Sequence, residues 1–269
     1  MSEMLQAMLD VRVLHWVVPV FGAAVGSFLN VVIWRLPRDE SLVRPGSHCS
    51  SCGVPIRWYD NIPLLSWLWL RGRCRACRSW ISVRYPLIEL LTALLGLGLL
   101  YRYGPSWRFL AYFVFAAALL AASAIDLEHR IIPDEISLGG IALGLLLAFF
   151  SKATVPRWDS LIGAAVGFLI LFLVMAGYWL ITRREGMGLG DAKLLAAIGA
   201  FLGWPAIPFV LLAGSLAGTL IGLGLILLRR QGRFYKIPFG PFLSMGAWLW
   251  LFLRPELQHT IFMLPGGGG

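Results

Sequence analysis

The chain has 269 residues, of which 58% are hydrophobic and 14% charged, and its mean hydropathy is +0.76. A soluble domain carries nearer a quarter charged residues, so this composition indicates a membrane protein and excludes an ordinary soluble fold. The net charge of +9 does not indicate nucleic-acid binding, because the positive-inside rule already accounts for excess basic residues in membrane proteins.

Eight apolar runs are candidates for membrane-spanning helices, which need about 17–25 residues. In chain order they are Val11–Ile33, Tyr85–Tyr101, Trp107–Ile125, Glu135–Phe150, Leu161–Ile181, Ala192–Trp204, Ala206–Leu228 and Pro238–Leu253. The sixth run is short for a span. We therefore expect an all-α polytopic membrane protein with about eight transmembrane helices. Glycine spacings such as Gly22-x3-Gly26 predict close helix packing within it.

Composition divides the chain into four parts. These are a first transmembrane helix in 1–34, a polar segment in 35–84, a transmembrane domain in 85–255 and a tail in 256–269. If the polar segment is cytoplasmic, 17 of the 23 Lys and Arg residues lie on the cytoplasmic side. This bias predicts that both termini face outward. Acidic residues precede the first apolar run, which is not the pattern of a cleaved signal peptide.

The polar segment contains two cysteine pairs, Cys49-x2-Cys52 and Cys74-x2-Cys77. Two such pairs supply the four thiolates of a tetrahedral zinc site. A segment of about 50 residues buries little core, so a metal would contribute folding energy that packing cannot. Two disulfides or a redox pair are the alternatives, and a cytoplasmic location argues against disulfides. Four cysteines leave no open coordination position, so we expect a structural zinc without a catalytic role.

Acidic residues within or beside spans are costly and mark candidate functional sites. Asp126 ends the third run, Asp191 opens the sixth, and Glu89 lies inside the second. Each has a structural alternative: Asp134 and Asp191 could cap helices, Asp126 could pair with a neighbouring basic residue, and Glu89 could bind another helix. However, Asp126 and Asp191 fall on the same membrane face in the orientation above.

Two facing carboxylates cannot both ionise cheaply, so they share a proton. One can then deprotonate a water while the other donates to the scissile carbonyl oxygen. If the two helices are neighbours, this pattern suggests peptide hydrolysis without a covalent intermediate, with Asp126 and Asp191 as the catalytic residues; capping and packing remain the alternatives. Glycines at 186, 188 and 190 would let an extended peptide approach the backbone there.

The chain resembles the type IV prepilin peptidases, which are membrane aspartic peptidases of the GxGD type. The resemblance rests on "GLGD" at Gly188–Asp191 and on the blocks "GSFLNVVIWRLP", "NIPLLSWLWLRGRCRAC", "ISVRYPLIELLTA", "IDLEHRIIPD" and "KIPFGPFL". These motifs cover nearly the whole chain in the family's order. Asp126 and Asp191 match the family's catalytic aspartates. The cysteines match the four that many bifunctional members carry.

The resemblance implies cleavage of the short basic leader of prepilins and pseudopilins at the cytoplasmic face of the bacterial inner membrane. It also implies methylation of the new N-terminal residue with S-adenosylmethionine. No glycine-rich nucleotide-binding pattern is present. Glu89 and Asn30 are the candidates for contacting the substrate or this cofactor, and intramembrane hydrogen bonding is their alternative role. Acidic groups such as Glu128 or Glu185 are expected to face the leader. The rival hypotheses are a transporter and a non-catalytic zinc-bearing membrane scaffold.

Overall fold

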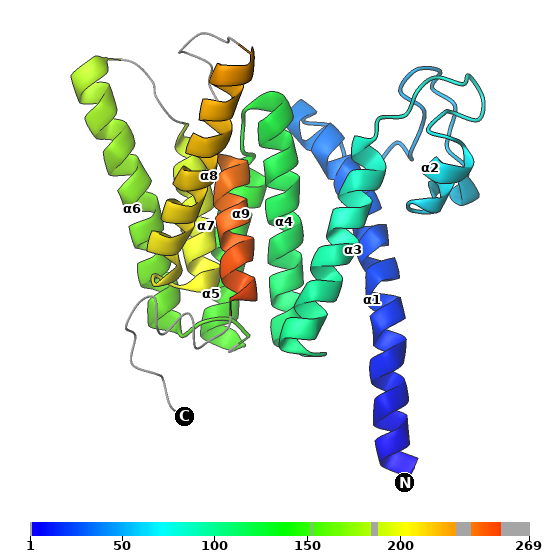
Figure 1. Cartoon of the computed structure of the whole chain (residues 1–269), viewed down its shortest axis with the longest axis horizontal. Helices are drawn as coiled ribbons and strands as arrows, with labels where there is room; N and C mark the ends of the chain where they lie inside the picture. Colours follow the sequence, from blue (N-terminus) through cyan, green and yellow to red (C-terminus); the bar gives the residue numbers. More distant parts are fainter. Residues whose placement is uncertain (1, 152, 184–187, 230–237, 254–269) are drawn as a thin grey trace. The chain divides into compact units, whose positions relative to one another are not determined.

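The computed structural model describes residues 2–151, 153–183, 188–229 and 238–253, and in these ranges the regular elements are helices (Figure 1). The long helices are α1 (Ser2–Arg35), α3 (Arg84–Tyr103), α4 (Trp107–His129), α5 (Asp134–Phe150), α6 (Arg157–Thr182), α7 (Leu189–Leu202), α8 (Ala206–Arg229) and α9 (Gly240–Phe252). Between α1 and α3 lie the short elements η1 (Leu36–Arg38), η2 (Trp58–Asn61) and α2 (Leu65–Trp69). The all-α prediction is therefore confirmed.

Each of the eight predicted ranges contains a helix, but the helices differ in their capacity to span a bilayer. Within the described residues, five are long and apolar enough: Val13–Arg38, Arg84–Tyr103, Trp107–His129, Arg157–Thr182 and Ala206–Gly224. The others, α5, α7 and α9, have 17, 14 and 13 residues. At about 1.5 Å per residue α7 covers only about 21 Å, less than the roughly 30 Å hydrocarbon core.

The chain forms two compact units, Met1–Ala121 and Ala122–Gly269. The first keeps the polar segment together with α1 and α3, and the second contains α5 to α9, while α4 runs through the boundary. The division expected from composition differs, because it placed a boundary between the polar segment and α3.

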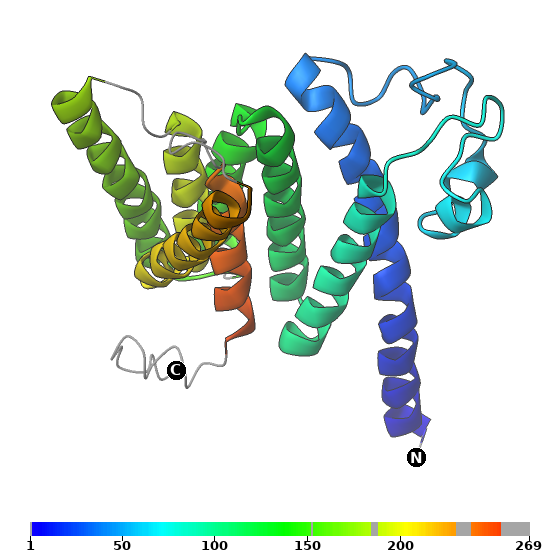
Figure 2. The same cartoon turned by 45° about the horizontal axis from the view of Figure 1, so that its top comes forward.

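In the first unit, α1 and α3 pack closely through glycine, and both views show them side by side (Figure 2). A Cβ atom at Gly26 would lie 2.6 Å from the Cα of Glu89, and one at Gly22 would lie 2.8 Å from the Cα of Ala93. Real Cβ atoms do not approach backbone so closely, so the spacing of these two glycines fixes how near the helices come. The predicted role of Gly22-x3-Gly26 in packing is confirmed.

The buried end of α1 organises the start of the polar segment. Arg35 is 6% exposed. Its guanidinium donates to the carbonyl oxygens of Ser41 at 2.9 Å and Pro45 at 2.7 Å. These charge-assisted bonds hold the chain that leads to the first cysteine pair against the helix end.

Helix α7 is the centre of the second unit, and from Asp191 to Leu202 every residue except Lys193 is buried. On α6, a Cβ at Gly167 would lie 2.6 Å from the carbonyl oxygen of Leu195. The Ser160 hydroxyl donates to the carbonyl oxygen of Ala200 at 2.6 Å. Small residues and one interhelical hydrogen bond thus bring the two helices into backbone contact, as is typical within membranes.

We expect Gly199→Ala to destabilise the protein by at least about 2 kcal/mol, because a methyl group there would overlap the backbone carbonyl of Gly163. Thermal unfolding in detergent measures the effect. Gly177→Ala on α6 is the control, since a Cβ there meets nothing within 4 Å, and alanine is the better helix former. Equal melting temperatures for the two variants would contradict this packing.

Candidate active site and metal centre

Two buried aspartates from different helices meet in the second unit. Asp126 lies one turn before the end of α4 and is 5% exposed, and Asp191 is the third residue of α7 and is 9% exposed. The two carboxyl groups are close enough to interact electrostatically. The structure therefore brings together the two residues that the sequence predicted as a pair.

Three helix ends surround this acidic pair. The backbone N–H of Gly240, the first residue of α9, donates to Oδ2 of Asp126 at 3.0 Å. The side chain of Ile132 lies between Gly190 and Gly240. A Cβ added at Gly190 would be 3.1 Å from the Cβ of Ile132, and one added at Gly240 would be 3.2 Å from its Cδ1. Because Gly190 and Gly240 have no side chains, Ile132 of the α4–α5 loop can pack against both.

The structural alternatives for two of these acids are wrong. Helix α7 begins at Leu189, and its N-cap is Gly188. Helix α5 begins at Asp134, and its N-cap is Pro133. Neither N-cap residue makes a side-chain capping hydrogen bond. Asp191 is therefore inside the helix and not its cap. Asp134 instead accepts a hydrogen bond from Lys193 at 2.7 Å, which ties the start of α5 to α7.

The sequence predicts that Asp126 is catalytic. On that prediction Gly240→Ala is expected to slow peptide cleavage by at least about tenfold, because a small displacement of a catalytic group is costly. The variant keeps the N–H donor, but its Cβ would lie 2.8 Å from Oδ2 of Asp126 and would push the carboxylate aside. Gly218→Ala is the matched control, since its Cβ would meet the ring of Phe242, also on α9, at an ordinary 3.4 Å. Rates of prepilin cleavage for the two variants, with equal expression and melting temperature, provide the comparison.

Asn30 and Glu89 lie together in the seam between α1 and α3, and both are buried. The side-chain amide of Asn30 donates to the carbonyl oxygens of Gly26 at 3.3 Å and Tyr85 at 3.1 Å, and its Oδ1 has no hydrogen-bond partner among the described residues. The Glu89 carboxylate accepts from the N–H of Leu64 at 2.7 Å. Intramembrane hydrogen bonding, the alternative role for these residues, is thus part of what they do.

The four cysteines converge at one point of the polar segment through two similar turns. Cys49 N–H donates to the Val54 carbonyl oxygen and Cys74 N–H donates to that of Ser79. In each turn the residue after the second cysteine has a positive φ, 71° at Gly53 and 61° at Arg78. The repeated geometry aims each pair of thiols to the same side.

The thiol cluster suits a tetrahedral metal ion. All four Sγ atoms lie within 4.8 Å of one another, and those of Cys49 and Cys77 are 3.8 Å apart. Tetrahedral zinc with Zn–S bonds of about 2.3 Å places its sulfurs about 3.8 Å apart. The cysteines are free, not disulfide-bonded. The Ser79 hydroxyl lowers the pKa of the Cys77 thiol, which favours the thiolate that a metal binds.

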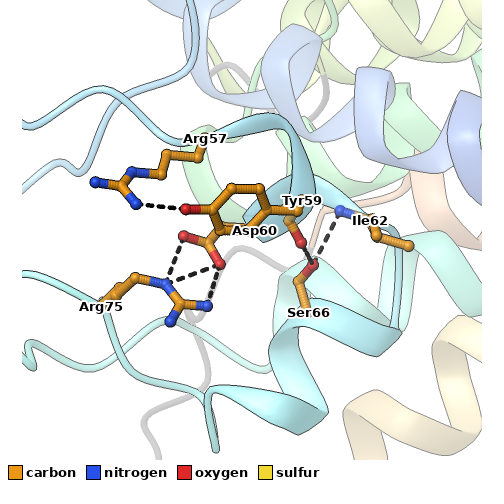
Figure 3. Close-up of polar contacts among 6 residues, drawn as sticks. All are labelled: Arg57, Tyr59, Asp60, Ile62, Ser66 and Arg75. Carbon is orange, nitrogen blue, oxygen red and sulfur yellow. Dashed lines mark hydrogen bonds and ion pairs between the residues drawn. The ribbon is translucent and has the colours of Figure 1, made fainter.

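A second polar cluster connects the turn of the second cysteine pair to the chain before α2 (Figure 3). Arg75, between Cys74 and Cys77, forms a bidentate ion pair with Asp60, with its Nη2 2.6 Å from Oδ1. This hydrogen-bonded ion pair lowers the pKa of Asp60. The Ser66 hydroxyl of α2 donates to the Tyr59 carbonyl oxygen at 3.0 Å and accepts from the Ile62 N–H at 2.9 Å.

Sequence reasoning missed several of these contacts. The Gly240 donor lies in the block "KIPFGPFL", which we read as a family motif without assigning its glycine a partner. The pairing of Lys193 with Asp134 and the placement of Ile132 join segments that no sequence pattern connects. Glu185, Gly186 and the predicted tail 256–269 lie outside the described residues.

Comparisons with known proteins identify the family of the chain. The model of the bacterial peptidase A24 N-terminal domain matches residues 20–103, and that of the type IV leader peptidase family matches residues 113–223. A prepilin leader peptidase/N-methyltransferase of Aeromonas hydrophila is 45% identical over 257 residues, covering 85% of this chain and 87% of the relative. One from Pseudomonas putida is 40% identical, covering 92% and 93%. No solved structure shows a significant match.

Fold and site together define a multi-pass membrane protein with a buried pair of aspartates and a four-cysteine cluster. The chain belongs to the type IV leader peptidase family, with the bacterial N-terminal domain of peptidase A24 preceding the peptidase part. The family prediction is confirmed, and so is the prediction of a bifunctional leader peptidase and N-methyltransferase.

Proposed function

We propose that Asp126 and Asp191 are the catalytic residues of the leader peptidase and that its substrates are prepilins or pseudopilins. The observation that supports this most strongly is the convergence of two buried carboxyl groups on α4 and α7, with the Gly240 N–H bound to one of them. Burial strengthens electrostatic interactions at the site and holds the pair in a fixed arrangement.

The two aspartates share one proton during the reaction. The ionised carboxylate removes a proton from a water molecule, and the protonated one donates to the carbonyl oxygen of the scissile peptide. The water oxygen bonds to the carbonyl carbon, which becomes tetrahedral. The carbon–nitrogen bond then breaks as the aspartic acid that took the water proton gives it to the leaving nitrogen, while the other aspartate takes a proton back from a hydroxyl of the intermediate. The products are the leader, with a new carboxyl group, and the mature chain, with a new α-amine. Because no residue attacks the peptide, no acyl-enzyme forms.

Both aspartates lie near helix ends, Asp126 three residues before the end of α4 and Asp191 three residues into α7. A proton or ion relay would instead place its carboxylates along the middle of long spans, so these positions favour the peptidase over a transporter. We place this end of the bundle on the cytoplasmic side of the bacterial inner membrane, because the basic residues gather there. The apolar helix of a prepilin would then reach the site from the bilayer while its leader stays in the cytoplasm.

We assign the four-cysteine cluster a structural zinc ion, held by Cys49, Cys52, Cys74 and Cys77. Zinc fits the all-thiolate donor set and the tetrahedral spacing of the sulfurs. With all four positions filled by protein, the ion stabilises the segment between α1 and α3 and takes no part in hydrolysis.

For the methyltransferase activity we assign S-adenosylmethionine as the methyl donor and Asn30 and Glu89 as candidate contacts. The donor supplies an electrophilic methyl group. The new α-amine and the sulfonium are both cationic, and the buried Oδ1 of Asn30 and the Glu89 carboxylate are acceptors suited to a cation. Glu89 would take the proton that the amine must lose to become nucleophilic.

Glu89→Gln is expected to lower methylation by at least about tenfold while cleavage continues, because glutamine still accepts from Leu64 N–H but cannot take a proton. Mass spectrometry of a prepilin after incubation with purified protein and S-adenosylmethionine reports cleavage and methylation together. The control is Thr92→Val, one turn further along α3, where the buried hydroxyl donates to the Ile88 carbonyl oxygen of its own helix. Unchanged methylation in Glu89→Gln would exclude Glu89 from this role.

The same assay tests the proposed function itself. The wild-type protein should convert a prepilin into free leader and a mature chain, and the mature chain should gain one methyl group. An intact prepilin after incubation with correctly folded protein would overturn the peptidase assignment.

A further inference from the structure

Helix α2 presents an unusually apolar surface outside the helix bundle. Leu65, Leu68 and Trp69 are 63%, 64% and 84% exposed. Their spacing of three and four residues places them on one face of the helix. This exposed surface, which we call the α2 face, consists of those three side chains.

The opposite side of α2 is packed against the polar segment, so the orientation of the helix is fixed. The indole N–H of Trp67 donates to the Ile81 carbonyl oxygen at 3.2 Å, and its ring contacts that of Trp80 edge to face. Ser66 is tied to Tyr59, as described above. These contacts fix the orientation of α2, and the α2 face is therefore directed away from the polar segment.

The depth of α2 relative to the membrane follows from its attachment to α3. Leu64, its N-cap, donates its N–H to the Glu89 carboxylate at 2.7 Å. Glu89 lies five residues after Arg84, the first residue of a membrane-length helix. At about 1.5 Å per residue this is about 7.5 Å beyond the helix start, within the roughly 5–10 Å to which interfacial helices bury their apolar face.

Basic side chains flank the α2 face. Arg71 and Arg73 follow the helix directly, and both are exposed. In residues 35–84 nine arginines stand against three acidic residues, Asp39, Glu40 and Asp60. Leucine and tryptophan next to arginine are the combination that enters the boundary between acyl chains and anionic headgroups.

We propose that α2 is an interfacial helix that inserts the α2 face into the anionic headgroup layer of the membrane that α1 and α3 cross. The lipid surface then holds the polar segment at a third point, besides its two helical connections. Because Arg75 links the second cysteine pair to Asp60 just before α2, this attachment also orients the four-cysteine cluster relative to the membrane.

Quenching of tryptophan fluorescence by brominated lipids tests the proposal. The full-length protein is placed in nanodiscs of phosphatidylglycerol brominated either near the headgroup end or near the methyl end of its acyl chains. The signal of one indole is the difference between wild-type protein and Trp69→Phe. We expect the shallow bromines to quench Trp69 at least about twofold more than the deep ones.

Trp67→Phe is the matched control, because Trp67 lies two residues away on the packed side of the same helix and should be quenched less than Trp69. A Leu68→Glu variant with unchanged metal content should lose much of the Trp69 quenching, since a carboxylate opposes insertion among anionic headgroups. Equal quenching of Trp67 and Trp69, or a Trp69 signal that neither lipid quenches, would overturn the proposal. Covering of the α2 face by a protein would give the latter result.

Discussion

Asp126→Asn and Asp191→Asn are each expected to reduce prepilin cleavage by about 10²-fold or more, because positioned general acid–base groups contribute about 10²–10⁴-fold. Asparagine has nearly the volume of aspartate, so both variants should keep the packing of α4 and α7. It accepts a hydrogen bond, as Asp126 does from Gly240, but it cannot take or give the proton that the reaction moves. Initial rates with a purified prepilin measure the loss.

The matched control is Asp134→Asn, because Asp134 is an acidic residue at the start of the neighbouring helix α5. Its side chain is 58% exposed and pairs with Lys193. Surface ion pairs contribute at most about 1 kcal/mol, so this variant should fold and cleave nearly as the wild type does. A loss as large as that of the two buried aspartates would mean that local charge, and not the buried pair, limits the reaction.

Removal of the metal is expected to unfold the segment between α1 and α3 while the helix bundle stays intact. Structural zinc in small domains contributes about 10–16 kcal/mol of apparent binding free energy, far more than this small segment gains from its few buried side chains. Chelation should therefore make the polar segment sensitive to protease. The glycine contacts of α1 with α3 do not involve the cysteines and should survive.

Cys74→Ser should lose the bound metal, and elemental analysis should find about one zinc per chain in the wild type and far less in the variant. Ser51→Ala, within the first cysteine pair but with no thiol, should keep the full metal content. Wild-type protein without zinc, or with its cysteines oxidised to disulfides, would contradict the structural-zinc assignment.

Much of the fold could be predicted from the sequence, because lipid imposes simple rules on it. Long apolar runs must be helices, and each of the eight predicted ranges contains one. Glycine spacing predicted the close contact of α1 with α3, since only glycine permits backbone to approach backbone there. The cysteine spacing likewise predicted the cluster, because two short turns of this kind present four thiols together.

The details of the site depended on contacts that sequence patterns do not carry. Asp191 was expected just before its helix, but α7 begins two residues earlier because Gly188 serves as the N-cap. The bond from Gly240 to Asp126 joins residues 114 positions apart. The outward direction of Leu65, Leu68 and Trp69 depends on how Trp67 and Ser66 pack, and a five-residue helix shows no periodicity from which this could be inferred.

A double-mutant cycle measures whether Asp126 and Asp191 act as one unit. Cleavage rates are compared for Asp126→Asn, Asp191→Asn and the protein that carries both substitutions, each shown to be folded by its melting temperature. If two residues share one proton, replacing either one removes the catalysis that both provide. The double variant should therefore cleave no more slowly than the slower single variant. Losses that multiply in the double variant, or a single variant that cleaves at the wild-type rate, would contradict a mechanism in which the two aspartates share one proton.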